Sequence, residues 1–289
     1  SQMGMWVQRI AIAWLTWELT KSPVWLGLMA MADFMPNIFL APLAGAIADR
    51  VDRLKAIRLY VFISAAISGA IAILIITDLI NIGTLLVLVL ANGVTMSFNF
   101  PVRLSIIHTL VRKESLTTAI SVNAIAFNIA RIGGPALSGQ MIVQLGIGFA
   151  LGFTVLADLI FVFMLYLIKI ANEDGAKKKQ RPSTKIWNDI IEGFKYVRTH
   201  SGIGPLLVIL AFYSIFGRPF IELFPAFADE IFNQGVNGLA TLTSILGLGS
   251  IFGSLFLARR SGVIGLTRLL IFNVFLLSVS VIGFGSTNL

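Results

Sequence analysis

Residues 59–77 read LYVFISAAISGAIAILIIT, a run of nineteen residues that contains no charged side chain. A helix of about 20 apolar residues matches the thickness of the hydrocarbon core of a bilayer. Further uncharged runs cover residues 79–102, 132–157, 231–258 and 269–289. Because these runs are long and continuously apolar, with no alternation of polar and apolar positions, they predict transmembrane helices and not the strands of a barrel. The predicted fold class is an all-α integral membrane protein.

The composition of the whole chain agrees with a membrane protein. Of 289 residues, 57% are hydrophobic and 12% are charged, and the mean hydropathy is +0.89. A soluble domain carries about 25% charged residues. The chain has no cysteine and two histidines, which excludes disulfides, cysteine-ligated metals, thiol catalysis and a His-rich metal site. We therefore expect no metal and no cofactor.

Hydropathy divides the chain into nine predicted spans, the first of them partial. They cover residues 3–19, 24–48, 56–76, 82–104, 116–144, 145–168, 203–227, 236–258 and 264–285. The basic residues set their orientation, since seventeen lie in the loops on one side and Lys21 alone lies on the other. By the positive-inside rule, the even-numbered spans end in the cytoplasm. The net charge of +8 is thereby explained without nucleic acid, and the predicted location is the cytoplasmic (inner) membrane.

A single long polar segment, residues 169–200, separates six spans from at least three more. Its second part, residues 183–199, has apolar residues at helical spacing on one face and charged residues on the other. This pattern favours an amphipathic helix at the membrane surface over a plain soluble linker. The predicted domains are an N-terminal six-helix half at 1–168, a cytoplasmic linker at 169–202, and three helices of a second half at 203–289.

The loop after the second span carries a recognisable motif. Residues 45–55 read GAIADRVDRLK. The residues that carry the motif are Gly45, Asp49, Arg50, Asp52, Arg53 and Lys55. This stretch resembles the G-x-x-x-D-R-x-G-R-[RK] loop between the second and third helices of the major facilitator superfamily. Most members have Gly where this chain has Asp52. An Asp there is similar to the drug- and siderophore-exporter branch, which includes the enterobactin exporter and macrolide efflux pumps.

Other motifs follow in the order of the same branch. Gly134, Pro135 and Gly139 resemble the Gly-Pro bend motif of antiporter fifth helices, and residues 217–229 resemble the opening of the second half. The resemblance implies twelve helices in two related halves, with a long linker after the sixth. We then expect nine of the twelve helices here, with the first clipped and the last three missing. It also implies that residues 45–55 act as a conformational latch.

Four charged residues inside or near the middle of spans are candidates for proton coupling or for the substrate cavity. They are Asp33, Arg131, Arg218 and Glu222. A charge at the bilayer centre costs about 2.5–3.5 kcal/mol on insertion scales, so such residues are functional candidates. A fifth, Asp158, is expected to be structural, because the sixth helix is peripheral in the family fold.

Each candidate has two interpretations. Asp33 can carry a proton, since a carboxyl group in low-dielectric surroundings takes up protons near neutral pH, or it can pair permanently with Arg131. Arg131 can bind an anionic substrate group or hold helices together. Arg218 and Glu222 lie one turn apart and can form a structural or gating pair.

The function that these features favour is secondary active transport, specifically proton-coupled efflux of small amphipathic molecules such as drugs or siderophores. The expected partners are the small-molecule substrate, protons and membrane lipid, with no nucleic acid, and the full-length protein is expected to be a monomer. No nucleotide-binding motif supports coupling to ATP. The alternatives are an importer of the same superfamily, a non-transporting membrane sensor or receptor, and a membrane-embedded enzyme. The last lacks an obvious catalytic constellation, so we expect no enzymatic activity.

Overall fold

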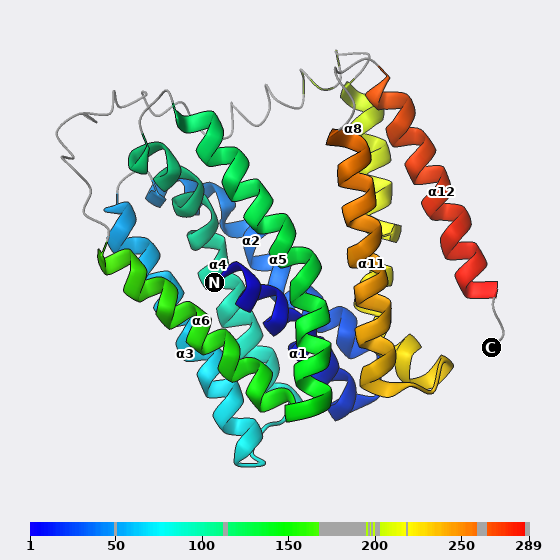
Figure 1. Cartoon of the computed structure of the whole chain (residues 1–289), viewed down its shortest axis with the longest axis horizontal. Helices are drawn as coiled ribbons and strands as arrows, with labels where there is room; N and C mark the ends of the chain where they lie inside the picture. Colours follow the sequence, from blue (N-terminus) through cyan, green and yellow to red (C-terminus); the bar gives the residue numbers. More distant parts are fainter. Residues whose placement is uncertain are drawn as a thin grey trace. The chain divides into compact units, whose positions relative to one another are not determined.

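The structure is a computed structural model that describes residues 1–48, 51–111, 115–167, 195, 197, 199, 203–217, 219–258 and 265–286. Within these residues the regular structure is entirely helical, as the sequence predicts (Figure 1). The first six helices are α1 (Gln2–Thr20), α2 (Pro23–Ala48), α3 (Arg53–Ile76), α4 (Ile82–Leu110), α5 (Leu116–Leu145) and α6 (Ile147–Leu167).

After the linker, one predicted span is a chain of short elements. It consists of α8 (Ile203–Phe212), the π-helix η3 (Tyr213–Gly217), α9 (Pro219–Glu222), α10 (Phe224–Ala226) and the π-helix η4 (Phe227–Ile231). Two long helices follow, α11 (Gly235–Ala258) and α12 (Leu266–Ser286). Pro219 and Pro225 lack backbone N–H groups, which accounts for interruptions of a regular helix in this stretch.

Seven helical segments among the described residues are long and apolar enough to cross a membrane. They correspond to seven of the nine predicted spans. A helical multi-pass membrane protein is therefore confirmed, whereas the number of nine spans stays a prediction. The two segments that do not meet the criterion are α1 and α5. Both are regular helices, and α5 carries several polar side chains along its length, among them Asn123, Asn128 and Arg131.

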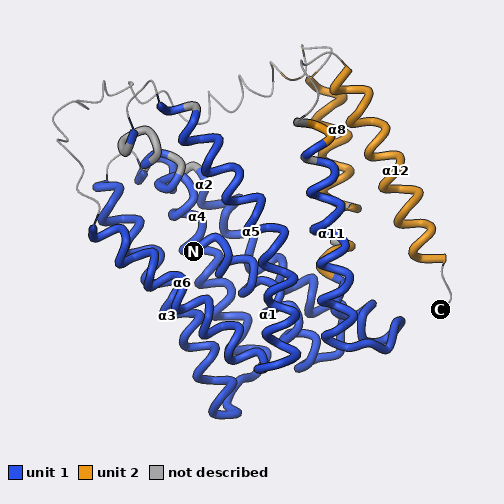
Figure 2. The backbone as a smooth tube through the Cα atoms, viewed as in Figure 1, with its two compact units in different colours: residues 1–171, 223–255 blue, residues 172–222, 256–289 orange. Residues whose placement is uncertain are grey.

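The chain forms two compact units (Figure 2). The first contains residues 1–171 and 223–255, and the second contains residues 172–222 and 256–289. In the first unit, α2 packs against α4, α3 packs against α4 and α6, and α1 packs against α5 and α6. In the second unit, η3 contacts α12, and the Phe220 and Phe284 rings meet edge to face with centroids 5.1 Å apart.

The helices of the first unit approach closely where small residues face one another. A Cβ atom built on Gly93 of α4 would lie 2.6 Å from the carbonyl oxygen of Asp33 and 2.7 Å from that of Ala32. Pro36 cannot donate to the Ala32 carbonyl four residues earlier, so this oxygen has lost its helical partner. Glycine at position 93 therefore lets the backbone of α4 reach α2 beside Asp33.

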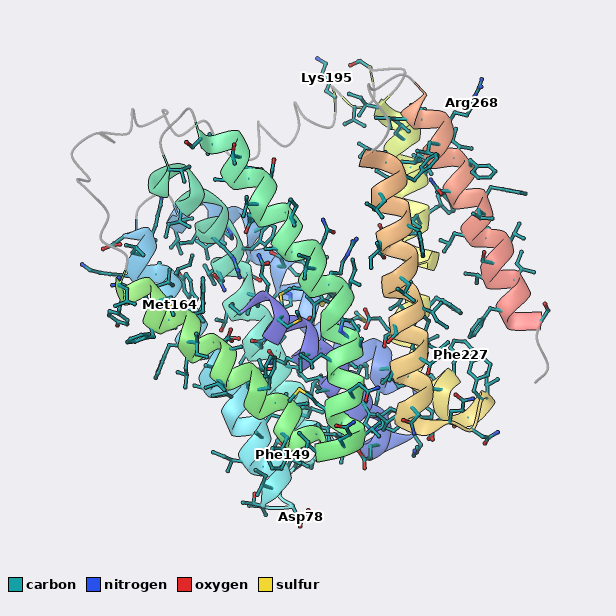
Figure 3. All side chains as sticks on the ribbon, viewed as in Figure 1. Asp78, Phe149, Met164, Lys195, Phe227 and Arg268 are labelled. Atoms are coloured by element: carbon teal, nitrogen blue, oxygen red, sulfur yellow. The ribbon has the colours of Figure 1, made fainter. Side chains whose placement is uncertain are left out.

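Large apolar side chains cover the outside of the helices. Phe149 and Met164 of α6 are 66% and 51% exposed and project outward from the ribbon (Figure 3). In water such a surface would be unfavourable, whereas in a bilayer it meets lipid chains of the same polarity. The linker predicted at 169–202, with its amphipathic helix, lies outside the described residues except for Lys195, Val197 and Thr199.

Candidate functional site

Three helices of the first unit bring a cation together with aromatic rings. The guanidinium carbon of Arg9 on α1 lies 4.7 Å from the ring centroid of Phe34 on α2 and 5.7 Å from that of Trp6. The Trp6 ring meets Phe127 of α5 edge to face, with centroids 6.1 Å apart. We call these four residues the cation–aromatic face. Each cation–π contact contributes about 0.5–2 kcal/mol, more when water is excluded.

Asp33 adjoins this face. It is half-buried on α2, directly before Phe34, in the turn that Gly93 brings against α4. The close approach of two backbones holds this turn of α2 in place. A carboxyl group and the Arg9 guanidinium thus belong to helix turns that contact each other within the membrane-spanning region.

Arg131 extends the face along α5. It lies one turn after Phe127, and its side chain is exposed. Asn128 donates its Nδ2 hydrogen to the carbonyl oxygen of Ala124, 3.0 Å away, so this amide is engaged within its own helix. A permanent pair of Arg131 with Asp33 stays a prediction.

The residues of the predicted bend motif in α5 are buried contact points. Gly134 lies against Trp6 of α1, and a Cβ atom on Gly139 would lie 2.8 Å from the Cα atom of Ala240 on α11. Between them the Ser138 hydroxyl donates to the carbonyl oxygen of Val7, 3.0 Å away, in buried surroundings. At these glycines α5 packs closely against α1 and α11.

The motif loop between α2 and α3 is described in part. Gly45 is half-buried in the last turns of α2, and Asp49 and Arg50 lie outside the described residues. Asp52 is the N-cap of α3, where its Oδ1 accepts from the backbone N–H groups of Leu54 and Lys55 at 3.0 and 3.1 Å. Arg53 begins the helix. An aspartate at the usual glycine position thus stabilises the start of α3.

The Asp52 carboxylate has a further partner in the Lys55 ammonium, with 3.3 Å between Oδ2 and Nζ. Slight burial acts to raise the pKa of Asp52. The hydrogen bonds from the backbone and side chain of Lys55, together with its charge, outweigh that effect and hold the pKa below its usual value.

At the opposite end of the bundle one carboxylate oxygen joins segments far apart in sequence. Oδ2 of Asp229 in η4 accepts from the indole N–H of Trp17 at 2.8 Å and from the Lys21 ammonium at 2.5 Å. Lys21 ends α1 in the left-handed conformation, with φ of 48°, and its N–H bonds the carbonyl oxygen of Trp17. This contact, the Trp17–Lys21–Asp229 clip, connects α1 to the segment that precedes α11.

The remaining predicted candidates belong to the second unit. Arg218 lies outside the described residues, so its predicted pair with Glu222 stays a prediction. Glu222 is half-buried at the end of α9. The described residues contain no group of three or more His, Cys, Asp or Glu side chains arranged to bind a metal ion.

The sequence reasoning missed Arg9 and its aromatic partners as members of a site. A signal existed, because Trp6 and Arg9 are three residues apart and Phe127 and Arg131 are four apart, which places each pair on one helix face. What the sequence could not show was that α1, α2 and α5 present these faces to one another.

Comparison with known proteins assigns the chain to a family. Residues 1–288 match the family model described as transmembrane secretion effector. The chain belongs to this family of the major facilitator superfamily. It is therefore a member of a family of membrane transporters and not of enzymes, as the motif loop and the topology predicted.

Three relatives are similar to this chain over about two thirds or more of its length. The staphyloferrin A transporter of Staphylococcus aureus is 21% identical over 282 residues, which are 97% of this chain and 70% of the relative. Macrolide efflux protein A of Streptococcus pyogenes is 21% identical over 274 residues, 95% of this chain and 67% of the relative. An uncharacterized MFS-type transporter of Bacillus subtilis, YfiS, is 26% identical over 201 residues, 68% of this chain and 46% of the relative.

Proposed function

We propose that this transporter exports small amphipathic molecules from the cell in exchange for protons. The supporting observation is the cation–aromatic face, with Asp33 in the adjacent turn. Aromatic rings bind the apolar part of a substrate, and guanidinium groups such as those of Arg9 and Arg131 bind carboxylate or hydroxyl oxygens. Relatives named for staphyloferrin A and for macrolides indicate the size and mixed polarity of the compounds to test.

In this proposal Asp33 is the proton-coupling carboxyl. It is an acid in the interior of α2, and the close α2–α4 contact at Gly93 keeps its turn fixed while other helices move. Protonation of Asp33 would change the charge beside Arg9 and so alter how strongly the face attracts an anionic or polar substrate group. One inward proton and one outward substrate then use the same region in alternation.

The test separates coupling from binding in the single variant Asp33→Asn. The amide resembles the neutral acid, so we expect loss of proton-driven efflux of a labelled macrolide or of labelled staphyloferrin A. Exchange of labelled for unlabelled substrate across vesicles without a proton gradient should persist. Glu18→Gln, an exposed acid near the end of α1, is the matched control and should leave both activities unchanged.

The Arg9→Gln variant tests the face itself. It removes the cation but keeps a polar side chain of similar length, and we expect weaker substrate binding with normal abundance in the membrane. Full proton-driven efflux by Asp33→Asn protein would refute the assignment of Asp33 and make Glu222 the next candidate. Absence of efflux of every tested compound, together with uptake, would favour import instead.

We also propose that the loop at residues 45–55 is a conformational latch at the cytoplasmic end. Support comes from the cap that Asp52 places on α3, which holds Arg53 and Lys55 in the first helical turn. Asp49→Asn should impair transport and leave expression nearly intact. Unchanged efflux at normal abundance would mean that the loop only sets the orientation of the protein in the membrane.

For the architecture, we propose nine spans in the order inferred from the sequence. These are the six-helix half at 1–168, the linker at 169–202, and three helices of a second half at 203–289, in the cytoplasmic membrane. The full-length protein is expected to act as a monomer. Because it lacks cysteine, Lys55→Cys and Leu79→Cys can report the two ends of α3 without background. An impermeant thiol reagent on intact cells should label position 79 and spare position 55, and the reverse pattern would invert the topology.

A further inference from the structure

A second group of polar side chains is buried inside the first unit, among α1, α3, α4 and α6. Gln8, Asn99 and Asp158 are 4%, 3% and 5% exposed, and they line one small cavity together with Ser64 and Arg103. On α1, Gln8 belongs to this group while Trp6 and Arg9 belong to the cation–aromatic face. The two groups therefore use different side chains of the same helix.

Two polar atoms on this cavity lack partners among the described residues. They are the acceptor Oδ1 of Asn99 and the donor Nε2 of Gln8. Buried polar groups are nearly always hydrogen-bonded, so each such atom requires an explanation. Ser64 cannot donate to Asn99, because its hydroxyl hydrogen is donated to Oδ1 of Asn92 at 3.1 Å.

The size and lining of the cavity fit a single water molecule. Its volume is about 20 Å³, above the 10–15 Å³ or so that one water needs. A water there can accept from Gln8 Nε2 and donate to Asn99 Oδ1 and to the Asp158 carboxyl. Three polar partners are the usual number for buried water.

The guanidinium group that faces Asp158 is not hydrogen-bonded to it. Arg103 of α4 faces it, and the guanidinium carbon of Arg103 lies 5.3 Å from the ring centroid of Phe161, one turn beyond Asp158 on α6. No hydrogen bond joins Arg103 and Asp158 within the described part of the chain. Ser1 is the other facing residue: its side chain hydrogen-bonds the Asp158 carboxylate and its amino group adds a positive charge, while α3 contributes the neutral Val61 and Ser64.

We infer that Asp158 is a buried proton-exchanging carboxyl served by a water molecule in this cavity, separate from the cation–aromatic face. Removal of a carboxylate from water is unfavourable, and protonation removes the charge. The protonated carboxyl can then donate a hydrogen bond to the water or to Asn99. In the exchange, one proton moves from solvent through the water to the carboxylate and returns by the same path, and no other bond changes.

This inference does not depend on which molecule the protein transports, so its test is spectroscopic. Infrared spectra of the purified protein in lipid are recorded over a range of pH in H2O and D2O. We expect a protonated-carboxyl C=O band in the wild type that D2O shifts, that disappears as pH rises, and that is lost in Asp158→Asn. Asp78→Asn, which removes an exposed acid in the turn after α3, should leave this band unchanged.

Two further variants keep the test decisive if Asp158→Asn does not fold. Asn99→Leu removes the acceptor beside the carboxyl and should shift the frequency of the band. Arg103→Gln removes the facing cation and should change the pH at which the band is lost. Identical spectra of the wild type and these variants throughout the pH range would show that Asp158 is permanently ionised and would overturn the inference.

Discussion

The Trp17–Lys21–Asp229 clip makes a quantitative prediction. Trp17 is fully buried and its indole N–H donates to Oδ2 of Asp229 at 2.8 Å, whereas the side chain of Lys21 is 54% exposed. Removing a charged acceptor from a buried donor costs about 1.5–3 kcal/mol, and an exposed ion pair contributes about 0–1 kcal/mol. We therefore expect Asp229→Ala to lower the free energy of unfolding by about 2–3 kcal/mol.

The assay is reversible unfolding of the purified protein in mixed micelles, followed by tryptophan fluorescence. Lys21→Ala should cost about 0–1 kcal/mol, because it removes the exposed contact alone. Asp229→Asn should cost less than Asp229→Ala, since the amide oxygen still accepts from Trp17. In a Trp17→Phe background, which lacks the N–H, the cost of Asp229→Ala should fall to that of Lys21→Ala. An undiminished cost in that background would refute the reasoning.

Three further predictions concern positions where a small change meets a defined contact. Gly93→Ala should destabilise by about 1–3 kcal/mol in the same unfolding assay, because its Cβ atom would press on the carbonyl oxygens of Ala32 and Asp33. Gly152→Ala, where no atom lies within 4 Å of the added carbon, is the matched control and should not destabilise. Gly139→Leu should separate α5 from Ala240 of α11 and lower the melting temperature more than Gly152→Leu does. Asp52→Ala should cost about 0.5–2 kcal/mol at neutral pH through loss of the α3 cap. Because the folded pKa of Asp52 is below its unfolded value, this difference should be present above the unfolded pKa and vanish as pH falls through the folded pKa.

The positions of the helices followed from the sequence almost completely. The second predicted span, 24–48, is α2 at Pro23–Ala48, and the fifth, 116–144, is α5 at Leu116–Leu145. Lipid imposes this, since an unpaired backbone group in hydrocarbon is so costly that an apolar run must be helical. Two predicted spans differ most from the structure: the span 203–227 is divided into short elements that run to Ile231, and α4 continues to Leu110 instead of ending at 104. Helix α4 continues beyond the apolar run, which ends at residue 102. Pro101 removes one backbone hydrogen bond but does not end the helix.

The identity of the family also followed from local sequence, through the loop at 45–55 and the motifs at 134–139 and 217–229. Part of the loop motif performs its task within one turn, so it can be recognised from local sequence. Asp52 shows this, since an N-cap depends on the backbone of the next three residues and on nothing remote.

The partners of the charged residues were decided by the tertiary structure. Sequence reasoning offered Arg131 as one possible partner of Asp33 and did not place Arg9, which the structure brings to the adjacent Phe34. Asp229, the last residue of the motif at 217–229, bonds Trp17 and Lys21, more than 200 residues earlier in the chain. Such pairings depend on which helix faces meet, and that is set by packing of small residues such as Gly93, Gly134 and Gly139. In lipid nearly every face of an apolar helix is acceptable, so hydropathy locates each helix along the chain but leaves its neighbours and its rotation to the fold.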